Sequence, residues 1–285
     1  MATTVSTTVQ DEWTSDFFGS LNEVPAEPVA GIAQILEAMG TEPGFRAARL
    51  GVLRDLGLRD GASVLEAGCG TGVALPDLIE VGGPNLQVMG FDPTDSFVAL
   101  ARARAARLGA RQARYERGDI RALPLDGDPQ LDAAFCDKVL IHAGPTAAAL
   151  RELIRVVRPG GRVGAIEWYP QFCLSTTDPA HEAAVNAMFR RICNDYTVAG
   201  NLARHFKAAG LQDIQTRTSV THADNLDDHP FWRAFLIEQL PMFVHAEVLD
   251  PQIGQMLAED LQRLSASGNF HSSVMICTAV GTKSA

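Results

Sequence analysis

The decapeptide Ser63-Val64-Leu65-Glu66-Ala67-Gly68-Cys69-Gly70-Thr71-Gly72 joins an apolar run to three glycines spaced two residues apart. The run has the length and composition of a buried strand, and the glycines allow a sharp turn at which a ligand can approach the backbone. A helix is expected directly after the turn, and the free N–H groups at its start suit polar ligand groups. The stretch therefore predicts a strand, turn and helix that bind a ligand. A glycine turn alone also fits an ordinary connection, so its neighbours matter.

Two acidic residues farther along the chain fit the same ligand site. Asp92 ends the next apolar run, about 20 residues after the glycines, where a carboxylate can accept hydrogen bonds from both hydroxyls of a ribose. Asp119 follows the third run, where it could take an adenine amino group while Ile120 packs on the ring. Asp119 also fits an ordinary turn residue or helix cap.

Short apolar runs alternate with amphipathic helices from Ser63 to Trp168, which is typical of βαβ units and a parallel sheet. We expect an α/β fold with seven strands, at 63–67, 86–91, 113–117, 131–136, 161–168, 211–220 and 270–280. Helices are expected between them at about 73–81, 94–108, 146–157 and 198–209, and the run Arg158-Pro159-Gly160-Gly161 predicts a turn.

The segments outside this alternation are expected to be helical covers. Residues 1–58 form an N-terminal helical segment and lid, in which Gly40 ends one helix and Pro43 opens the next. Residues 59–285 form the main domain, with helical insertions near 169–200 and 228–266. Aromatic residues in the second insertion favour apolar packing and could line a pocket, namely Phe231, Trp232, Phe235 and Phe243.

Composition excludes several classes of protein. The chain of 285 residues has 24 Lys+Arg against 34 Asp+Glu, and this net charge of −10 is a poor match to a nucleic-acid backbone. The five cysteines are scattered without a C-x-x-C pair, so we expect neither a disulfide framework nor a metal site. No long apolar run or secretory signal is found. We therefore expect a cytoplasmic protein that acts away from membranes.

Five motifs resemble, in order and spacing, those of class I S-adenosylmethionine-dependent methyltransferases: Val64 to Gly72, Phe91-Asp92, Gly118-Asp119, Leu131 to Phe135 and Arg155 to Gly161. Within that class the chain is similar to the ubiquinone/menaquinone-biosynthesis-type group and its small-molecule, natural-product branch. The resemblance implies a Rossmann-like, mostly parallel seven-stranded sheet whose last strand is antiparallel. It also implies S-adenosylmethionine as cofactor, bound over the carboxyl ends of the first two strands.

The resemblance assigns cofactor contacts residue by residue. Gly68, Gly70 and Gly72 would meet the methionine part, Asp92 the ribose, and Asp119 with Ile120 the adenine. Glu66 would order the loop or reach the cofactor's amino group through water. Asp137 would touch the cofactor or cap a helix. The aromatic residues Trp13, Phe17 and Phe18 match a helix that closes over the cofactor in this group, although they also fit core contacts.

Two residues are candidates for the chemistry of transfer. A hydroxyl acceptor needs a base, and His142 follows the fourth strand where relatives carry histidines and the substrate pocket opens. Packing beneath the pocket explains His142 equally well, and the segment Ala143 to Thr146 departs from the run usual in relatives. Glu167 ends the fifth strand on the same rim, where it could position the substrate or hold the insertion in place.

Two other functions stay open. A dehydrogenase also uses glycines and an acid, but Val73 fills the place of the third glycine of the dinucleotide pattern. A non-methylating S-adenosylmethionine-binding protein of the same fold would keep every cofactor motif. The sequence leaves the acceptor, the methylated element (oxygen, nitrogen or carbon) and a homo-oligomeric state open.

Overall fold

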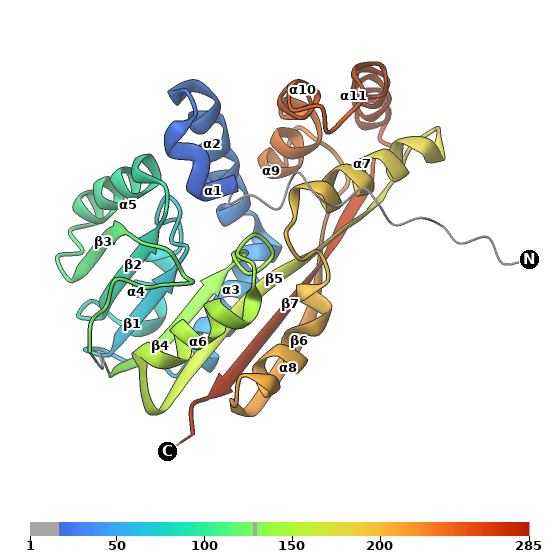
Figure 1. Ribbon diagram of the computed structural model, residues 1–285. Coiled ribbons are helices and arrows are strands. Elements are labelled where there is room, and N and C mark those ends of the chain that lie inside the picture. Colours follow the sequence, from blue (N-terminus) through green and yellow to red (C-terminus); the bar gives the residue numbers. More distant parts are fainter. Residues whose placement is uncertain (1–16, 128–129, 285) are drawn as a thin grey trace, which may run out of the picture.

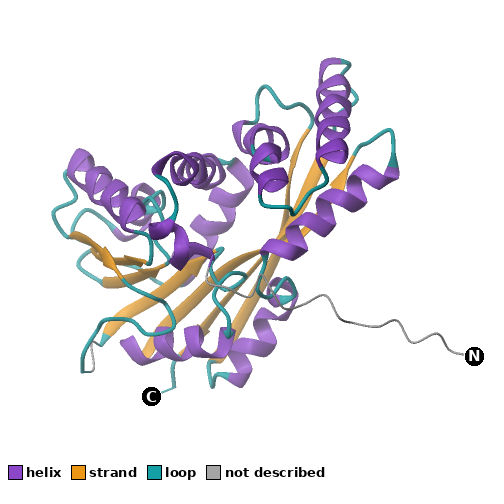
Figure 2. Cartoon of the chain, turned by 45° about the horizontal axis from the view of Figure 1, so that its top comes forward, coloured by secondary structure: helices purple, strands orange, loops and turns teal. Residues whose placement is uncertain are grey.

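The computed structural model describes residues 17–127 and 130–284, which form one seven-stranded sheet with helices on both faces (Figures 1 and 2). The strand order is β3-β2-β1-β4-β5-β7-β6. Strand β7 runs antiparallel to both β5 and β6, and the pairs among β1 to β5 are parallel. The Rossmann-like sheet with an antiparallel last strand is therefore confirmed. The strands are β1 Ser63–Ala67, β2 Gln87–Asp92, β3 Ala113–Arg117, β4 Leu131–Asp137, β5 Val157–Leu174, β6 Gln212–Ala223 and β7 Ser272–Thr282.

Helices pack on the sheet and also gather above the carboxyl ends of its strands. On one face α3 packs against α4 and against β5 to β7, and on the other α6 lies beside α8. Helices α2, α9 and α10 lie above the carboxyl ends of the strands (Figure 1). The helices are α1 Phe17–Ser20, α2 Ala26–Thr41, α3 Pro43–Asp55, α4 Leu75–Gly82, α5 Asp95–Leu108, α6 Thr146–Val156, α7 Pro179–Ile192, α8 Val198–Ala208, α9 Pro230–Arg233, α10 Leu240–His245 and α11 Pro251–Ala266, with a 3₁₀ turn η1 at Leu21–Glu23 and a π-helical turn η2 at Ala234–Glu238.

Helix α3 begins where the sequence predicts. Pro43 occupies the first turn, and the Glu42 side chain caps the helix by accepting a hydrogen bond from the Phe45 N–H at 3.0 Å. Its apolar stripe is buried against the sheet, so closely that a Cβ on Gly164 of β5 would come within 2.8 Å of the Val52 side chain. The glycine at position 164 thus lets α3 pack directly on β5.

Strand β5 is longer than the predicted 161–168 at both ends. The expected turn at Arg158 to Gly161 is an irregularity inside β5, where Leu131 pairs with Val157 and Ala133 pairs with Arg162. At the other end β5 pairs with β7 as far as Leu174, with a register shift between Tyr169 and Phe172. Pro170 lies in that shift, because a proline cannot donate to the ladder and is tolerated at a bulge. The helical cover accordingly starts at Pro179 and not at 169.

The N-terminal cover is described from residue 17 onward. The expected role of Trp13 and of the Phe17 side chain falls outside the described part, whereas Phe18 is partly buried. Within residues 17–127 and 130–284, no helix combines the length and apolar character that a membrane crossing requires.

Candidate active site

The glycine turn after β1 has the backbone that its sequence predicts. Gly68, Gly70 and Gly72 have φ values of 72°, 50° and 72°, in the left-handed region that favours glycine. A Cβ on Gly68 would lie 2.3 Å from the Val139 side chain, so glycine is also needed there for space. A Cβ on Gly70 would lie 3.5 Å from the Leu36 side chain, an ordinary contact distance, so glycine is favoured there by its φ angle and not by space.

Asp92 at the end of β2 is tied to this turn. One carboxylate oxygen accepts the Gly70 N–H and the other accepts the Thr94 N–H, each at 2.9 Å. A carboxylate oxygen can accept two hydrogen bonds, so each keeps a lone pair for a ligand. Burial raises the pKa of Asp92 to about 6, and the two backbone hydrogen bonds oppose that rise.

Asp119 and Ile120 lie on the same side of the site but differ in surroundings. Ile120 is buried, and its side chain lines the cavity between the carboxyl ends of the strands and the covering helices. Asp119 is half-exposed and already accepts hydrogen bonds from the backbone N–H and the guanidinium of Arg121, at 2.7 and 2.9 Å. Burial alone would raise the pKa of Asp119, but these bonds lower it. Any ligand amino group would share this carboxylate with Arg121.

Glu66 lies beneath the glycine turn and does not line the cavity. Its side chain is buried, and Oε2 has no hydrogen-bond partner in the described residues. Burial raises the pKa of Glu66 to about 8, with Arg49 opposing that rise. Because a buried oxygen without a partner is costly, a water that bridges Glu66 to a ligand in the cavity would satisfy it.

A buried ion-pair network supports the site from below, and the sequence analysis missed it. Arg49 of α3, with a side chain only 1% exposed, pairs with Asp77 of α4 at 2.6 Å and Asp137 of β4 at 3.2 Å. It also donates to the carbonyl of Gly40 near the end of α2, at 2.6 Å. The signal was present, because Phe45, Arg49 and Leu53 follow one face of a helix at i, i+4 and i+8. An arginine within an apolar stripe indicates a buried partner.

Asp137 connects this network to the cavity. Its other oxygen accepts a hydrogen bond from the ammonium of Lys138 at 2.5 Å, and both residues line the cavity. Burial would raise the pKa of Asp137, but Lys138 and Arg49 lower it. Asp137 is therefore a carboxylate at neutral pH, as the predicted cofactor contact requires, and it caps no helix.

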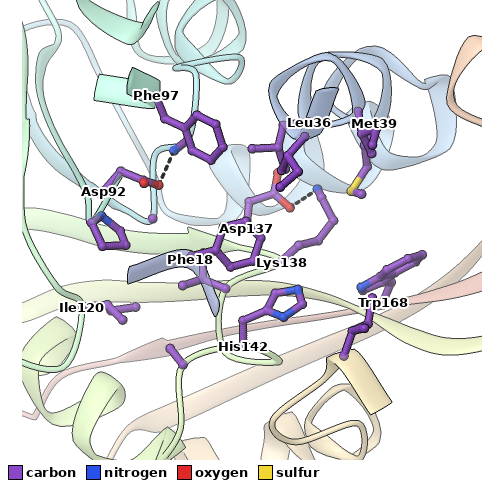
Figure 3. Close-up of a pocket in the computed structure, with 18 of the residues that line it drawn as sticks. Phe18, Leu36, Met39, Asp92, Phe97, Ile120, Asp137, Lys138, His142 and Trp168 are labelled. Atoms are coloured by element: carbon purple, nitrogen blue, oxygen red, sulfur yellow. Dashed lines mark hydrogen bonds and ion pairs between the residues drawn. The ribbon is translucent and has the colours of Figure 1, made fainter. Parts of the chain in front are cut away.

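The cavity itself lies between the carboxyl ends of the strands and the covering helices, with a volume of about 210 Å³. Figure 3 shows His142, Trp168, Asp92 and Ile120 around one space, with Phe18 between them. Most of the wall is apolar. Its lining residues are Phe18, Ile32, Ile35, Leu36, Met39, Gly68, Gly70, Asp92, Pro93, Phe97, Asp119, Ile120, Arg121, Asp137, Lys138, Val139, His142, Ala143, Trp168, Ile192, Phe235, Gln239, Met242, Phe243 and Ala246.

His142 lines this cavity, on the turn that leaves β4. Phe18 packs edge-on against the imidazole with ring centroids 4.9 Å apart (Figure 3). Burial lowers the pKa of His142 to about 4, partly offset by a hydrogen bond to the Ile192 carbonyl. Its Nδ1 is buried and has no partner in the described residues, whereas the residue as a whole is partly exposed and lines the cavity. With a pKa of about 4 the ring is neutral at pH 7, and one of its two nitrogens keeps a lone pair.

Glu167 is placed differently from His142. It is fully buried beneath the turn after β4 and does not line the cavity. Its Oε1 accepts the N–H groups of Val139 and Leu140 at 3.0 and 2.7 Å, which holds the turn that carries His142. Burial raises the pKa of Glu167 to about 8.

An aromatic cluster forms the wall opposite the glycine turn. Trp168 at its centre meets Phe45, Phe172, Phe189, Phe231 and Phe235 at centroid distances of 5.1 to 6.4 Å. Trp168, Phe235 and Phe243 reach the cavity, whereas Phe231 and Trp232 pack behind it. The sequence places Phe231, Trp232, Phe235 and Phe243 in one insertion but gives no sign of which of them face the cavity.

Comparison with known proteins agrees with this geometry. Residues 64–161 match the family described as methyltransferase domain. The chain is 38% identical to an uncharacterized 37.1 kDa transposon protein of Streptomyces fradiae, over 47% of this chain and 38% of that protein. It is 30% identical to the demethylmenaquinone methyltransferase of Lactococcus lactis, over 42% and 47% of the two chains. The chain thus spans less than half the length of these two relatives.

The fold has solved counterparts as well. The YcgJ protein of Bacillus subtilis matches with a TM-score of 0.59 and 20% identity, covering 84% of this chain and 99% of its own. Among the described residues, no group of three or more His, Cys, Asp or Glu side chains is arranged to hold a metal ion. The glycine turn, its acidic partners and the matched segment together show that this chain carries a class I S-adenosylmethionine-dependent methyltransferase domain.

Proposed function

We propose that this protein transfers a methyl group from S-adenosylmethionine to a small-molecule acceptor held in the cavity. One observation carries the proposal: Gly70 and Asp92 line the same cavity as His142. A cofactor over the glycine turn and an acceptor beside His142 would share one enclosed space, as direct transfer requires. The net charge of −10 supports a small molecule rather than a nucleic acid as acceptor.

The residues present fit such a cofactor. Gly70 offers a bare backbone toward the cavity, and Asp92 keeps a free lone pair on each oxygen for ribose hydroxyls. Ile120 presents an apolar surface for the adenine. The cofactor's ammonium group would find the carboxylate of Asp137 on the cavity wall and the orphaned Glu66 Oε2 behind the turn.

The chain's own contribution to transfer is orientation and acceptance of a proton. When bound, the cofactor supplies an electrophilic methyl group on a sulfonium. The apolar wall excludes water from the space around it, and Trp168 with its neighbours confines the acceptor. The imidazole of His142 accepts a hydrogen bond from the acceptor, and takes its proton if the nucleophile is a hydroxyl.

The expected setting follows from the same features. We infer a cytoplasmic enzyme that modifies a secondary metabolite, because the resemblance is to the natural-product branch of the class and the scattered cysteines suit a reducing compartment.

The direct test has two steps. Calorimetry with the full chain should show binding of S-adenosylmethionine and of S-adenosylhomocysteine, and mass spectrometry should detect S-adenosylhomocysteine released with an acceptor. Untargeted comparison of metabolites before and after gene deletion would identify that acceptor. Cofactor binding without release, for every acceptor the deletion reveals, would favour the non-methylating alternative. Tight binding of NAD in place of S-adenosylmethionine would favour a dehydrogenase.

A further inference from the structure

The half of the cavity farthest from the glycine turn has an almost wholly apolar wall. We call it the acceptor half and define it by Trp168, Ile192, Phe235, Met242 and Phe243, all of which line the cavity. Trp168, Phe235 and Phe243 are buried in the aromatic cluster, so the wall is fixed by packing. A surface of this kind binds apolar or aromatic ligands by removing their surface from water.

Apart from Asp92, which is assigned to the cofactor's ribose and has no ion pair among the described residues, the charges on the cavity wall are matched within the protein. Lys138 pairs with Asp137, which also pairs with the buried Arg49, and Arg121 pairs with Asp119. An acidic acceptor would have to compete with these carboxylates for its cation. A cationic acceptor would have to leave water for a wall of aromatic and aliphatic side chains. Either case costs desolvation energy that the described residues do not return.

Two neutral polar groups remain for the acceptor. Gln239 contributes an amide to the cavity wall, and His142 contributes a neutral imidazole. A neutral imidazole has one nitrogen that accepts a hydrogen bond and one that donates. An O–H or N–H group on the ligand can therefore be matched by His142, and a ligand without such a group leaves the accepting nitrogen without a partner in the closed cavity.

We propose that the acceptor is an uncharged, mainly apolar molecule with a ring system, and that a hydroxyl or N–H group on it faces the imidazole of His142. This substrate class rests on the proposed methyl transfer. It makes oxygen or nitrogen the methylated element and assigns Trp168, Phe235 and Phe243 to shape recognition. The attacking atom forms the bond to the methyl carbon as the carbon–sulfur bond breaks, and its proton passes to the neutral imidazole of His142.

Four probes on one ring system test the class. Binding to the protein loaded with S-adenosylhomocysteine is measured for 2-naphthol, 2-methoxynaphthalene, 2-naphthoate and 2-naphthylmethylammonium. We expect 2-naphthol to bind tightest and 2-methoxynaphthalene about 2- to 10-fold more weakly, which is the value of one hydrogen bond. The two ions should bind at least about tenfold more weakly than 2-naphthol. In His142→Phe the two neutral probes should become equal.

Two variants test whether the probes bind in this cavity. Ala246→Phe fills the acceptor side and should weaken every probe, whereas Ala147→Phe, on the exposed side of α6, should change none. Equal or tighter binding of either ion, or no binding of either neutral probe, would overturn the substrate class, as would wild-type protein that treats the two neutral probes alike. Calorimetry with S-adenosylhomocysteine alone separates the cases, because its failure in folded protein would instead remove the proposed function.

Discussion

The two sides of the cavity are built by different means. The cofactor side, with Gly68, Gly70 and Asp92, depends on backbone conformation and on N–H groups held by one carboxylate. The acceptor half depends on large side chains, such as Trp168 and Phe235, that come from β5 and a distant π-helical turn. Backbone geometry suits a ligand that never changes, and side-chain packing can be altered residue by residue. This division lets one fold keep its cofactor while its acceptor varies.

The largest expected effect concerns His142. We expect His142→Ala to lower kcat by about 10² to 10⁴-fold, because it removes the group that accepts the proton of a hydroxyl nucleophile. Affinity for S-adenosylmethionine should remain close to that of wild type. Steady-state kinetics and calorimetry on the same preparation measure the two quantities. A folded variant with unchanged kcat and kcat/KM from pH 6 to 9 would remove His142 from the mechanism.

The pH profile tests the same histidine without a substitution. The pKa of His142 is lowered to about 4, and the neutral ring is the active form. At saturating S-adenosylmethionine, kcat that depends on His142 should therefore persist as pH falls through 6.5, where an exposed histidine would become protonated, and decline only near 4. A loss of kcat/KM centred near pH 6.5 in wild type, and absent from His142→Ala, would contradict the buried environment of the ring.

The second-largest expected effect concerns Arg49, which links elements on the two sides of the cavity. Arg49 links the end of α2, helix α4 and the Asp137 end of β4, so its removal takes a buried cation from two buried carboxylates and leaves Asp77 with Arg46 alone and Asp137 with Lys138 alone. Arg49→Met should lower the free energy of unfolding by about 3 to 5 kcal/mol, measured by urea denaturation. Arg54→Met on the same helix is the control, since that side chain is 62% exposed and should stay within about 0.5 kcal/mol of wild type. Equal losses of unfolding free energy in the two variants would mean that the buried network adds nothing to stability.

The same division explains what sequence could predict. The positions of Gly68 to Gly72 and of Asp92 follow from local rules on φ angles and strand ends, and the structure places them on one cavity. The contacts of Trp168 with Phe235 depend on how β5 meets a segment far along the chain, and no local pattern encodes that distance. Asp119 is a third case. Its partner Arg121 is only two residues away in the sequence, but the pairing depends on side-chain geometry that the sequence does not give.

A smaller effect is expected on the cofactor side alone. Asp92→Ala should weaken binding of S-adenosylmethionine by about 10- to 150-fold, because hydrogen bonds to a charged acceptor are worth about 1.5 to 3 kcal/mol. Since burial raises the pKa of Asp92 to about 6, wild-type affinity should also fall as pH drops through 6 and the carboxylate becomes protonated. Calorimetry across pH 5 to 8 measures both.

Asp95→Ala supplies the control for Asp92. Asp95 begins α5 and its side chain is 63% exposed, so cofactor affinity should not change. Unaltered affinity in a folded Asp92→Ala protein would refute the assignment of the ribose site.

The smallest expected effect distinguishes a structural role of Glu167 from a direct part in methyl transfer. Its pKa of about 8 means that the side chain is a neutral acid at pH 7, and its role is to accept the Val139 and Leu140 N–H groups at Oε1. Glu167→Gln keeps that acceptor oxygen and should leave kcat and stability at pH 7 nearly unchanged. Glu167→Ala leaves both N–H groups without an acceptor and should cost about 1 to 3 kcal/mol of stability.

The pH dependence of stability gives the sharper measurement on Glu167. Because its folded-state pKa lies above the unfolded value, the folded protein holds a proton that the unfolded chain has lost, so this residue makes wild type less stable as pH rises from about 4.5 to 8. Glutamine cannot titrate and has no such slope. The stability of Glu167→Gln relative to wild type should therefore increase from pH 5 to 8 and level off above 8. Glu167→Gln could instead lower kcat as strongly as His142→Ala while its unfolding free energy equals that of wild type. The carboxyl group would then take part in methyl transfer, and holding the turn after β4 would not be its main role.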